Sequence, residues 1–110
     1  MPEIVVQREL PESDTTRHLY ILRLNPERLN CSRREFFDAL YAENTCPQVH
    51  YLPVYRHSYY EKLGYEKGLC PTAEKYYEEA MSIPLYYGLT DEDVEDVIMA
   101  VKKVVQFYRK

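Results

Sequence analysis

The segment QVHYLPVYRHSYY, residues 48–60, gathers the side chains best suited to contact a ligand. It holds two histidines and four tyrosines within thirteen positions. Histidine donates or accepts a hydrogen bond near neutral pH, and a tyrosine ring stacks on a sugar or a base. His50 and Tyr51 are consecutive, so an extended backbone would direct their side chains to opposite faces. Taken alone, the pattern fits either a ligand-facing loop or a half-buried layer of core tyrosines.

Other chemistries lack the spacing that they require. His50 and His57 are seven positions apart, and there is neither a Cys-x-x-Cys nor a helical His-x-x-x-His pattern, so no metal site is expected. The cysteines, Cys31, Cys46 and Cys70, are widely spaced and have no histidine beside them to act as a base. They are expected to be reduced and unreactive. The three glycines are too few and too scattered to form a phosphate-binding loop.

Composition restricts the class of protein. A chain of 110 residues with 45% hydrophobic residues is expected to form one globular domain. A net charge of −4 argues against nucleic-acid binding, and no apolar run approaches the ~20 residues that cross a bilayer. The N-terminus lacks the features of a signal peptide, so a cytoplasmic protein is expected. Tyrosine is abundant, and nine of the twelve lie between Tyr51 and Tyr87.

The first third of the chain predicts a strand followed by a helix. Residues 1–17 contain two prolines and a polar cluster, and are expected to form a connector or a loosely attached first strand. HLYILRL, residues 18–24, predicts a strand covered on both faces. Ser32 and Glu35 form a capping-box pattern that predicts a helix over roughly 33–43.

The middle of the chain predicts short elements. QVHYLPVY is expected to be a short strand or extended piece stopped by its proline, and SYYEKLGYEKG a short helix ending near Gly64. Thr72 is expected to cap the next helix, with SIPLYYG after it as an edge strand or extended loop. The expected apolar face of that helix comprises Ala73, Tyr76, Tyr77, Ala80 and Met81.

The last helix has the clearest pattern. Thr90 is its expected N-cap and Asp93 completes a capping box. An apolar stripe follows, made of Val94, Val97, Ile98, Val101, Val104, Val105 and Tyr108. The order of elements predicts an α/β or α+β fold with a small antiparallel or mixed sheet packed against helices.

Two stretches in combination carry a family resemblance. VHYLPVY…HSYYEKLGY, followed by CPTAEKYYEEAMSIPLYYGLTDEDVEDVI, resembles the C-terminal part of the DegT/DnrJ/EryC1/StrS family. These are pyridoxal-phosphate-dependent aminotransferases that act on nucleotide-linked keto sugars, and the resemblance is nearest to enzymes of spore coat polysaccharide and pseudaminic acid synthesis. It begins at HLYILRL, continues through RREFFDALYAE and ends at about Val105. It implies that residues 18–110 form the small domain of a type I aminotransferase.

The resemblance implies that most of the enzyme lies outside this chain. The family's large domain carries the lysine that forms a Schiff base with pyridoxal phosphate, and none of the six lysines here stands in a similar setting. The isolated chain is therefore expected to be inactive. The parent enzyme is expected to be a homodimer that converts a UDP-linked 4-keto sugar to an amino sugar.

Particular residues acquire roles through the same resemblance. His50 would donate or accept a hydrogen bond to the substrate, and Tyr51 would pack or stack against it. A stand-alone sugar-nucleotide-binding module, or a protein-interaction module, is the alternative. The implied substrate-binding stretch and its two weaker rim positions are Gln48, Val49, His50 and Tyr51, then Tyr55 and His57.

Overall fold

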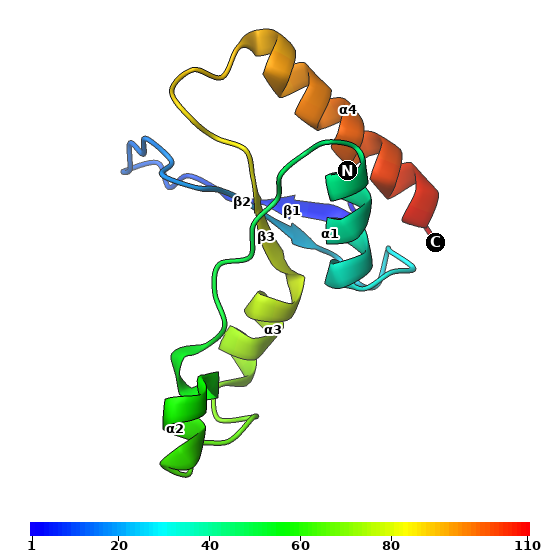
Figure 1. The fold of residues 1–110 in the computed structure, drawn as a ribbon. Helices are drawn as coiled ribbons and strands as arrows, with labels where there is room; N and C mark the ends of the chain where they lie inside the picture. The colour runs from blue at the N-terminus through cyan, green and yellow to red at the C-terminus, as the bar shows by residue number, and fades with distance from the viewer.

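The computed structural model describes all residues 1–110 and has a three-stranded antiparallel sheet at its centre (Figure 1). The strands are β1 (Ile4–Val6), β2 (Tyr20–Leu24) and β3 (Ala80–Ile83), in the order β1-β2-β3. Both neighbouring pairs are antiparallel. The prediction of a small antiparallel or mixed sheet packed with helices is confirmed.

The N-terminal segment contributes an edge strand to this sheet. Ile4 is opposite Leu24, and Val6 is opposite Leu22. A polar loop over residues 7–19 then connects β1 to β2. Residues 1–17, expected to be a connector or a loosely attached strand, thus include the paired strand β1.

Two helices cover one face of the sheet: α1 (Arg33–Ala42) and α4 (Asp91–Tyr108). Both expected capping boxes are present, because the Ser32 and Thr90 side chains each accept a hydrogen bond from the third helical residue. The buried core comprises Leu22, Leu24, Leu29, Phe36, Leu40, Met81, Ala100, Val101, Val104 and Val105. The helix predicted over roughly 33–43 and the last helix, predicted to be capped by Thr90, are therefore confirmed, and only the C-terminal half of the α4 stripe enters the core.

Strand β2 is covered less completely than its apolar sequence predicts. Leu22 and Leu24 are buried, whereas Ile21 and Arg23 on the other face are half-buried. Arg23 donates two hydrogen bonds to the buried carboxylate of Glu79, at 2.9 and 3.2 Å. The second face is thus covered in part by an ion pair instead of by an apolar layer.

The expected helix around Tyr76 begins and ends earlier than predicted. Helix α3 (Pro71–Glu79) has Cys70 at its N-cap position and Pro71 in its first turn, so Thr72 is not the cap. Ala80 and Met81, predicted on the helix face, lie in β3, where Met81 is opposite Leu22. The helix-to-strand change occurs without an intervening loop, so no turn residue marks it in the sequence.

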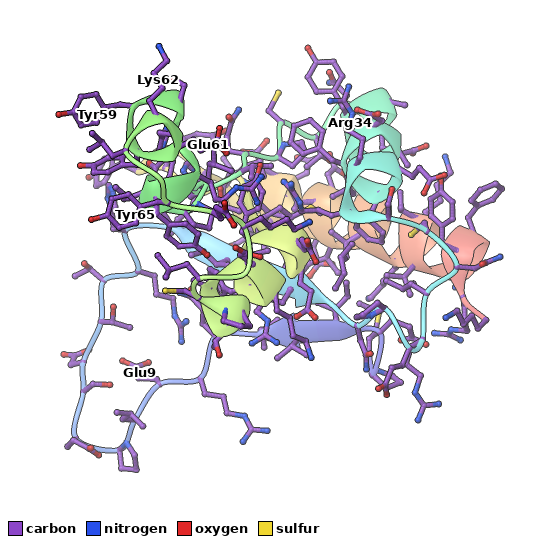
Figure 2. All side chains as sticks on the ribbon, turned by 90° about the horizontal axis from the view of Figure 1, so that it is seen from below. Glu9, Arg34, Tyr59, Glu61, Lys62 and Tyr65 are labelled. Atoms are coloured by element: carbon purple, nitrogen blue, oxygen red, sulfur yellow. The ribbon has the colours of Figure 1, made fainter.

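A segment that we call the arm, residues 49–79, projects away from the sheet (Figure 1). It contains the 3-10 turn η1 (Val54–Arg56), α2 (Ser58–Lys62) and α3. Figure 2 shows Tyr59 and Lys62 of α2 pointing away from the rest of the molecule. Gly64 has φ of +94° just beyond α2, which confirms the expected helix end.

The arm makes the molecule extended and rich in exposed surface. The radius of gyration of the whole chain is 15.7 Å, against about 13 Å for a compact domain of this length. The accessible surface is 8252 Å², whereas a compact protein of 13.2 kDa exposes roughly 6,400 Å². The excess is about 1,800 Å², and exposed apolar side chains of the arm account for part of it. None of the helices combines the length and the apolar character that crossing a membrane requires.

Candidate functional site

The predicted substrate-binding stretch begins at the outer edge of β3. The Gln48 N–H donates to the Ser82 carbonyl at 2.9 Å, and the Ser82 N–H donates to the Gln48 carbonyl at 2.8 Å. Thr45 and Pro47, just before Gln48, are buried. Only Gln48 of this stretch pairs with the sheet, so the predicted short strand does not form. Residues 49–53 leave the sheet as irregular chain, and Val54 begins η1. The starting point of the stretch is fixed by the sheet edge.

The His50 and Tyr51 rings lie against each other instead of on opposite faces. Their centroids are 4.6 Å apart and the ring planes meet at 78°, an edge-to-face contact. The peptide bond between them is cis. The expectation of opposite faces assumed a regular strand pleat, which ends at Gln48. The two side chains therefore present one combined surface.

This pair offers one polar atom and one open ring to a ligand. Nδ1 of His50 is buried and has no hydrogen-bond partner. Buried nitrogens of this kind are rare, because leaving one unpaired costs free energy. The Tyr51 side chain is 73% exposed, so its ring is available for stacking. A hydrogen-bonding imidazole beside an open phenol ring suits a ligand with both polar groups and a flat or sugar ring.

Tyr55 and His57, the expected rim positions, have different surroundings. The Tyr55 hydroxyl lies 2.7 Å from Oε1 of Glu74, to which it donates, and it accepts a hydrogen bond from the Cys70 N–H at 3.2 Å. Burial is the first cause that raises the pKa of Tyr55, and the hydrogen bond to Glu74 adds to it. His57 is exposed and precedes α2, where its side chain makes no capping hydrogen bond.

Glu74 forms polar contacts near this stretch that the sequence did not reveal. Its Oε1 also accepts a hydrogen bond from the Gly68 N–H at 2.7 Å. This backbone contact is the main cause that lowers the pKa of Glu74, followed by the hydrogen bond from Tyr55. The Tyr55 contact spans nineteen positions of the chain, so no local spacing announces it.

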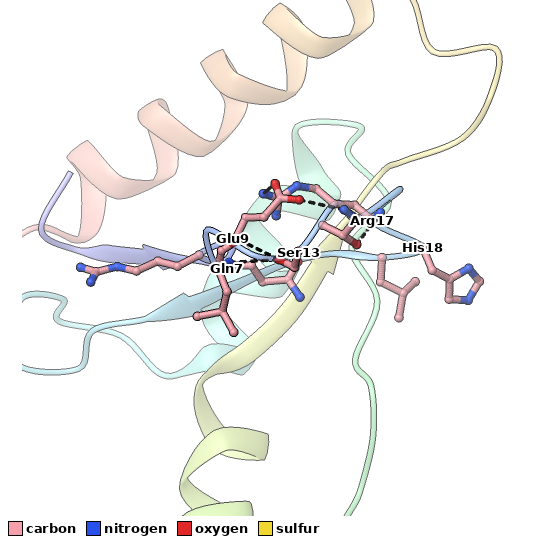
Figure 3. Close-up of a pocket in the computed structure, with 9 residues that line it drawn as sticks. Gln7, Glu9, Ser13, Arg17 and His18 are labelled. Carbon is pink, nitrogen blue, oxygen red and sulfur yellow. Dashed lines mark hydrogen bonds and ion pairs between the residues drawn. The ribbon is translucent and has the colours of Figure 1, made fainter.

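Two further concave regions lie away from this stretch. The loop between β1 and β2 borders an open hollow of about 440 Å³ with mostly polar lining residues, in which Glu9 pairs with Arg17 at 3.4 Å and accepts from the Thr15 N–H at 2.7 Å. Figure 3 shows His18 of the same loop turned away from this pair. An apolar groove of about 290 Å³ lies where Tyr20 and Ile83 meet the N-terminal half of α4. The N-terminal part of the predicted α4 apolar stripe lines this groove and is not covered by other elements.

Metal ligands and a lysine that could anchor a carbonyl cofactor are the remaining chemical groups of interest in the chain. No cluster of three or more His, Cys, Asp or Glu has the geometry of a metal site. All six lysines are exposed. Lys67, Lys75 and Lys103 pair with glutamates, and Lys110 donates to the Pro26 carbonyl.

Comparison with known proteins identifies one family. The DegT/DnrJ/EryC1/StrS aminotransferase family matches residues 1–102. The chain is 41% identical over 91 residues to the spore coat polysaccharide biosynthesis protein SpsC of Bacillus subtilis, covering 81% of this chain and 23% of that protein. It is 34% identical over 95 residues to a UDP-4-amino-4,6-dideoxy-N-acetyl-beta-L-altrosamine transaminase of Campylobacter jejuni, covering 84% of this chain and 25% of that protein.

The same fold occurs in a solved structure. Helicobacter pylori PseC, an aminotransferase of pseudoaminic acid biosynthesis, superposes with a TM-score of 0.87 over 98% of this chain and 29% of that protein. At 23% identity this likeness concerns the fold alone. The chain spans about a quarter of the length of the curated relatives that it matches.

Proposed function

This chain belongs to the DegT/DnrJ/EryC1/StrS aminotransferase family, and on that premise we propose that it is the C-terminal small domain of a sugar-nucleotide aminotransferase. The parent enzyme would convert a UDP-linked 4-keto sugar to an amino sugar for surface polysaccharide synthesis. The family match over residues 1–102 carries the proposal. The names of the Bacillus subtilis and Campylobacter jejuni relatives support the pathway and the substrate class.

Within the parent enzyme, the stretch from Gln48 to Tyr51 would contact the substrate. Gln48 fixes the start of the stretch at the sheet edge, as its two backbone hydrogen bonds to Ser82 indicate. The unpartnered Nδ1 of His50 supports a hydrogen bond to a polar group of the sugar nucleotide. The exposed Tyr51 ring supports stacking. Val49 would contribute backbone contacts between these residues.

Pyridoxal phosphate, which the family implies, has no suitable site in this chain. When bound, it supplies an electron sink that is held by a Schiff-base lysine and an acidic partner of its ring nitrogen. The lysines here are all exposed, and those with a close partner contact glutamate side chains or a backbone carbonyl. We propose that the anchoring lysine belongs to a large domain outside this sequence and that the isolated chain is inactive.

The same large domain is the proposed partner of the arm. The excess of about 1,800 Å² over a compact protein is large enough for one side of a stable interface, which needs roughly 800 Å². A homodimeric parent and a cytoplasmic location belong to this proposal, and the three free cysteines support the location. Nucleic acid is not among the proposed partners, since the chain carries a net charge of −4.

A domain exchange tests this function. Residues 1–102 would replace the matched quarter of the Bacillus subtilis relative, and the chimera would be assayed for amino transfer from glutamate to a UDP-4-keto sugar. Loss of one substrate hydrogen bond in His50→Ala is expected to lower kcat/KM roughly 10- to 100-fold. His18→Ala, which removes an exposed imidazole in the loop between β1 and β2, is the matched control and should leave kcat/KM unchanged.

Two outcomes would count against the proposal. A folded chimera whose kcat/KM is insensitive to His50→Ala would remove the substrate role of this stretch. Tight binding of a UDP-sugar by the 110-residue chain alone would instead favour a stand-alone binding module.

A further inference from the structure

The stretch between Gln48 and Tyr55 is held at both ends. At its start, Gln48 forms two backbone hydrogen bonds with Ser82 of β3. At its end, the Tyr55 hydroxyl contacts both Glu74 and Cys70 of the α3 N-terminus. His50 and Tyr51 lie between these two attachment points. Fixing both ends of a short segment limits the conformations open to the residues between them.

The second attachment centres on one carboxylate. Glu74 Oε1 accepts from the Tyr55 hydroxyl and from the Gly68 N–H, each at 2.7 Å. We call Tyr55, Gly68, Cys70 and Glu74 the latch. Its contacts join η1, the loop after α2 and α3, which are otherwise exposed parts of the arm.

Both hydrogen bonds of the latch favour the ionised form of Glu74. The Gly68 N–H first, then the Tyr55 hydroxyl, hold the pKa of Glu74 below its usual value, and Arg56 and Lys67 act in the same direction. The pKa of Tyr55 is raised, so its hydroxyl keeps the proton that it donates. Gly68 has φ of +95°, a conformation that glycine adopts readily, and this orientation directs its N–H to the carboxylate.

We propose that Glu74 is a positioning residue: acting through Tyr55, it holds the 48–55 stretch so that the His50 and Tyr51 rings face the ligand together. The identity of that ligand, a sugar nucleotide, rests on the function proposed above, but the holding of the rings does not. Tyr55 acts in the same way, as the link between Glu74 and the stretch, and not as part of the ligand-contacting surface.

The test uses the 110-residue chain and the proton–proton nuclear Overhauser effect between the His50 and Tyr51 rings. Glu74→Ala and Tyr55→Phe are each expected to weaken this effect sharply, because the end of the stretch is released. Glu74→Gln should restore it, since an amide oxygen accepts the same two hydrogen bonds. Glu78→Ala is the control on the same helix, because Glu78 has only an exposed contact with Lys67 at 3.8 Å.

Circular dichroism of each variant separates release of the stretch from unfolding of α3. Tyr55→Phe removes only a hydroxyl, so it remains informative if Glu74→Ala unfolds the helix. An unchanged effect between the rings in folded Tyr55→Phe would overturn the proposal, as would equal weakening in Glu78→Ala.

The chimera described above supplies the functional readout. Glu74→Ala should raise KM for the sugar nucleotide roughly 10- to 100-fold with little change in kcat, because misplacement of binding residues has effects of this size. If His50→Ala leaves kcat/KM unchanged while the latch variants still separate the rings, the proposed substrate role of the stretch fails and the latch stands. If the rings stay together in the latch variants while His50→Ala lowers kcat/KM, the latch fails and the proposed function stands.

Discussion

Because the arm exposes apolar side chains, we predict that the 110-residue chain self-associates. The Leu63→Ser substitution measures the contribution of the arm to this self-association. The Leu63 side chain is 61% exposed just beyond α2. Full burial of a leucine contributes about 1.5–3 kcal/mol, so covering the exposed part contributes about 0.9–1.8 kcal/mol. A symmetric dimer contains this contact twice, which gives roughly 2–4 kcal/mol and a dissociation constant weakened roughly 20- to 400-fold.

Leu10→Ser provides a matched control for this prediction. Leu10 is also 61% exposed, but it lies in the loop between β1 and β2, outside the arm. Sedimentation equilibrium over a wide range of concentrations would give the dissociation constant of each protein. A wild-type chain that stays monomeric at several hundred micromolar, or equal weakening by the two substitutions, would refute the reasoning from the arm.

Three other predictions concern stability, measured by urea unfolding. Thr90→Ala should lower the unfolding free energy by about 1 kcal/mol because it removes a cap, whereas Thr72→Ala should change it by less than about 0.5 kcal/mol. Hydrogen bonds from Thr90 lower the pKa of Asp93. The stabilisation that these hydrogen bonds provide is therefore present above the unfolded pKa near 3.8 and is lost as pH falls through the lower folded pKa. Asp93→Asn should flatten this decline of the unfolding free energy with falling pH. Gly68→Ala should cost about 1–2 kcal/mol through its positive φ, and Gly88→Ala, at an ordinary φ with room for a methyl group, much less.

Elements with local signals were predictable from the sequence. The capping boxes at Ser32 and Thr90 mark the starts of α1 and α4, since capping depends on residues three positions apart. The apolar run from Tyr20 to Leu24 marks β2 for the same reason. The end of α3 was not predictable, because Ala80 and Met81 continue the helical pattern and enter β3 only through pairing with β2. Tertiary pairing there outweighs the local preference.

The site was predictable only in its composition. The density of histidine and tyrosine near His50 fitted either a ligand-facing stretch or a half-buried tyrosine layer, and the proposed roles came from the family resemblance. The arrangement of the His50 and Tyr51 rings depends on where the chain leaves the sheet at Gln48, which a pairing with distant Ser82 decides. Likewise, the partner of Tyr55 is Glu74, across a fold that no local spacing encodes.

The two ends of the chain are fastened together. Glu3 is buried and pairs with Arg109 at 2.7 Å, and the Lys110 N–H donates to the Arg28 carbonyl at 3.1 Å. A short linker would therefore join Lys110 to Met1 without disturbing the core, and new termini could be opened in the exposed loop near Glu12. Such a circular permutant would keep every strand pairing and both core helices, and its new termini would lie away from the sheet. The whole domain is thus suited to insertion between two neighbouring residues of another protein.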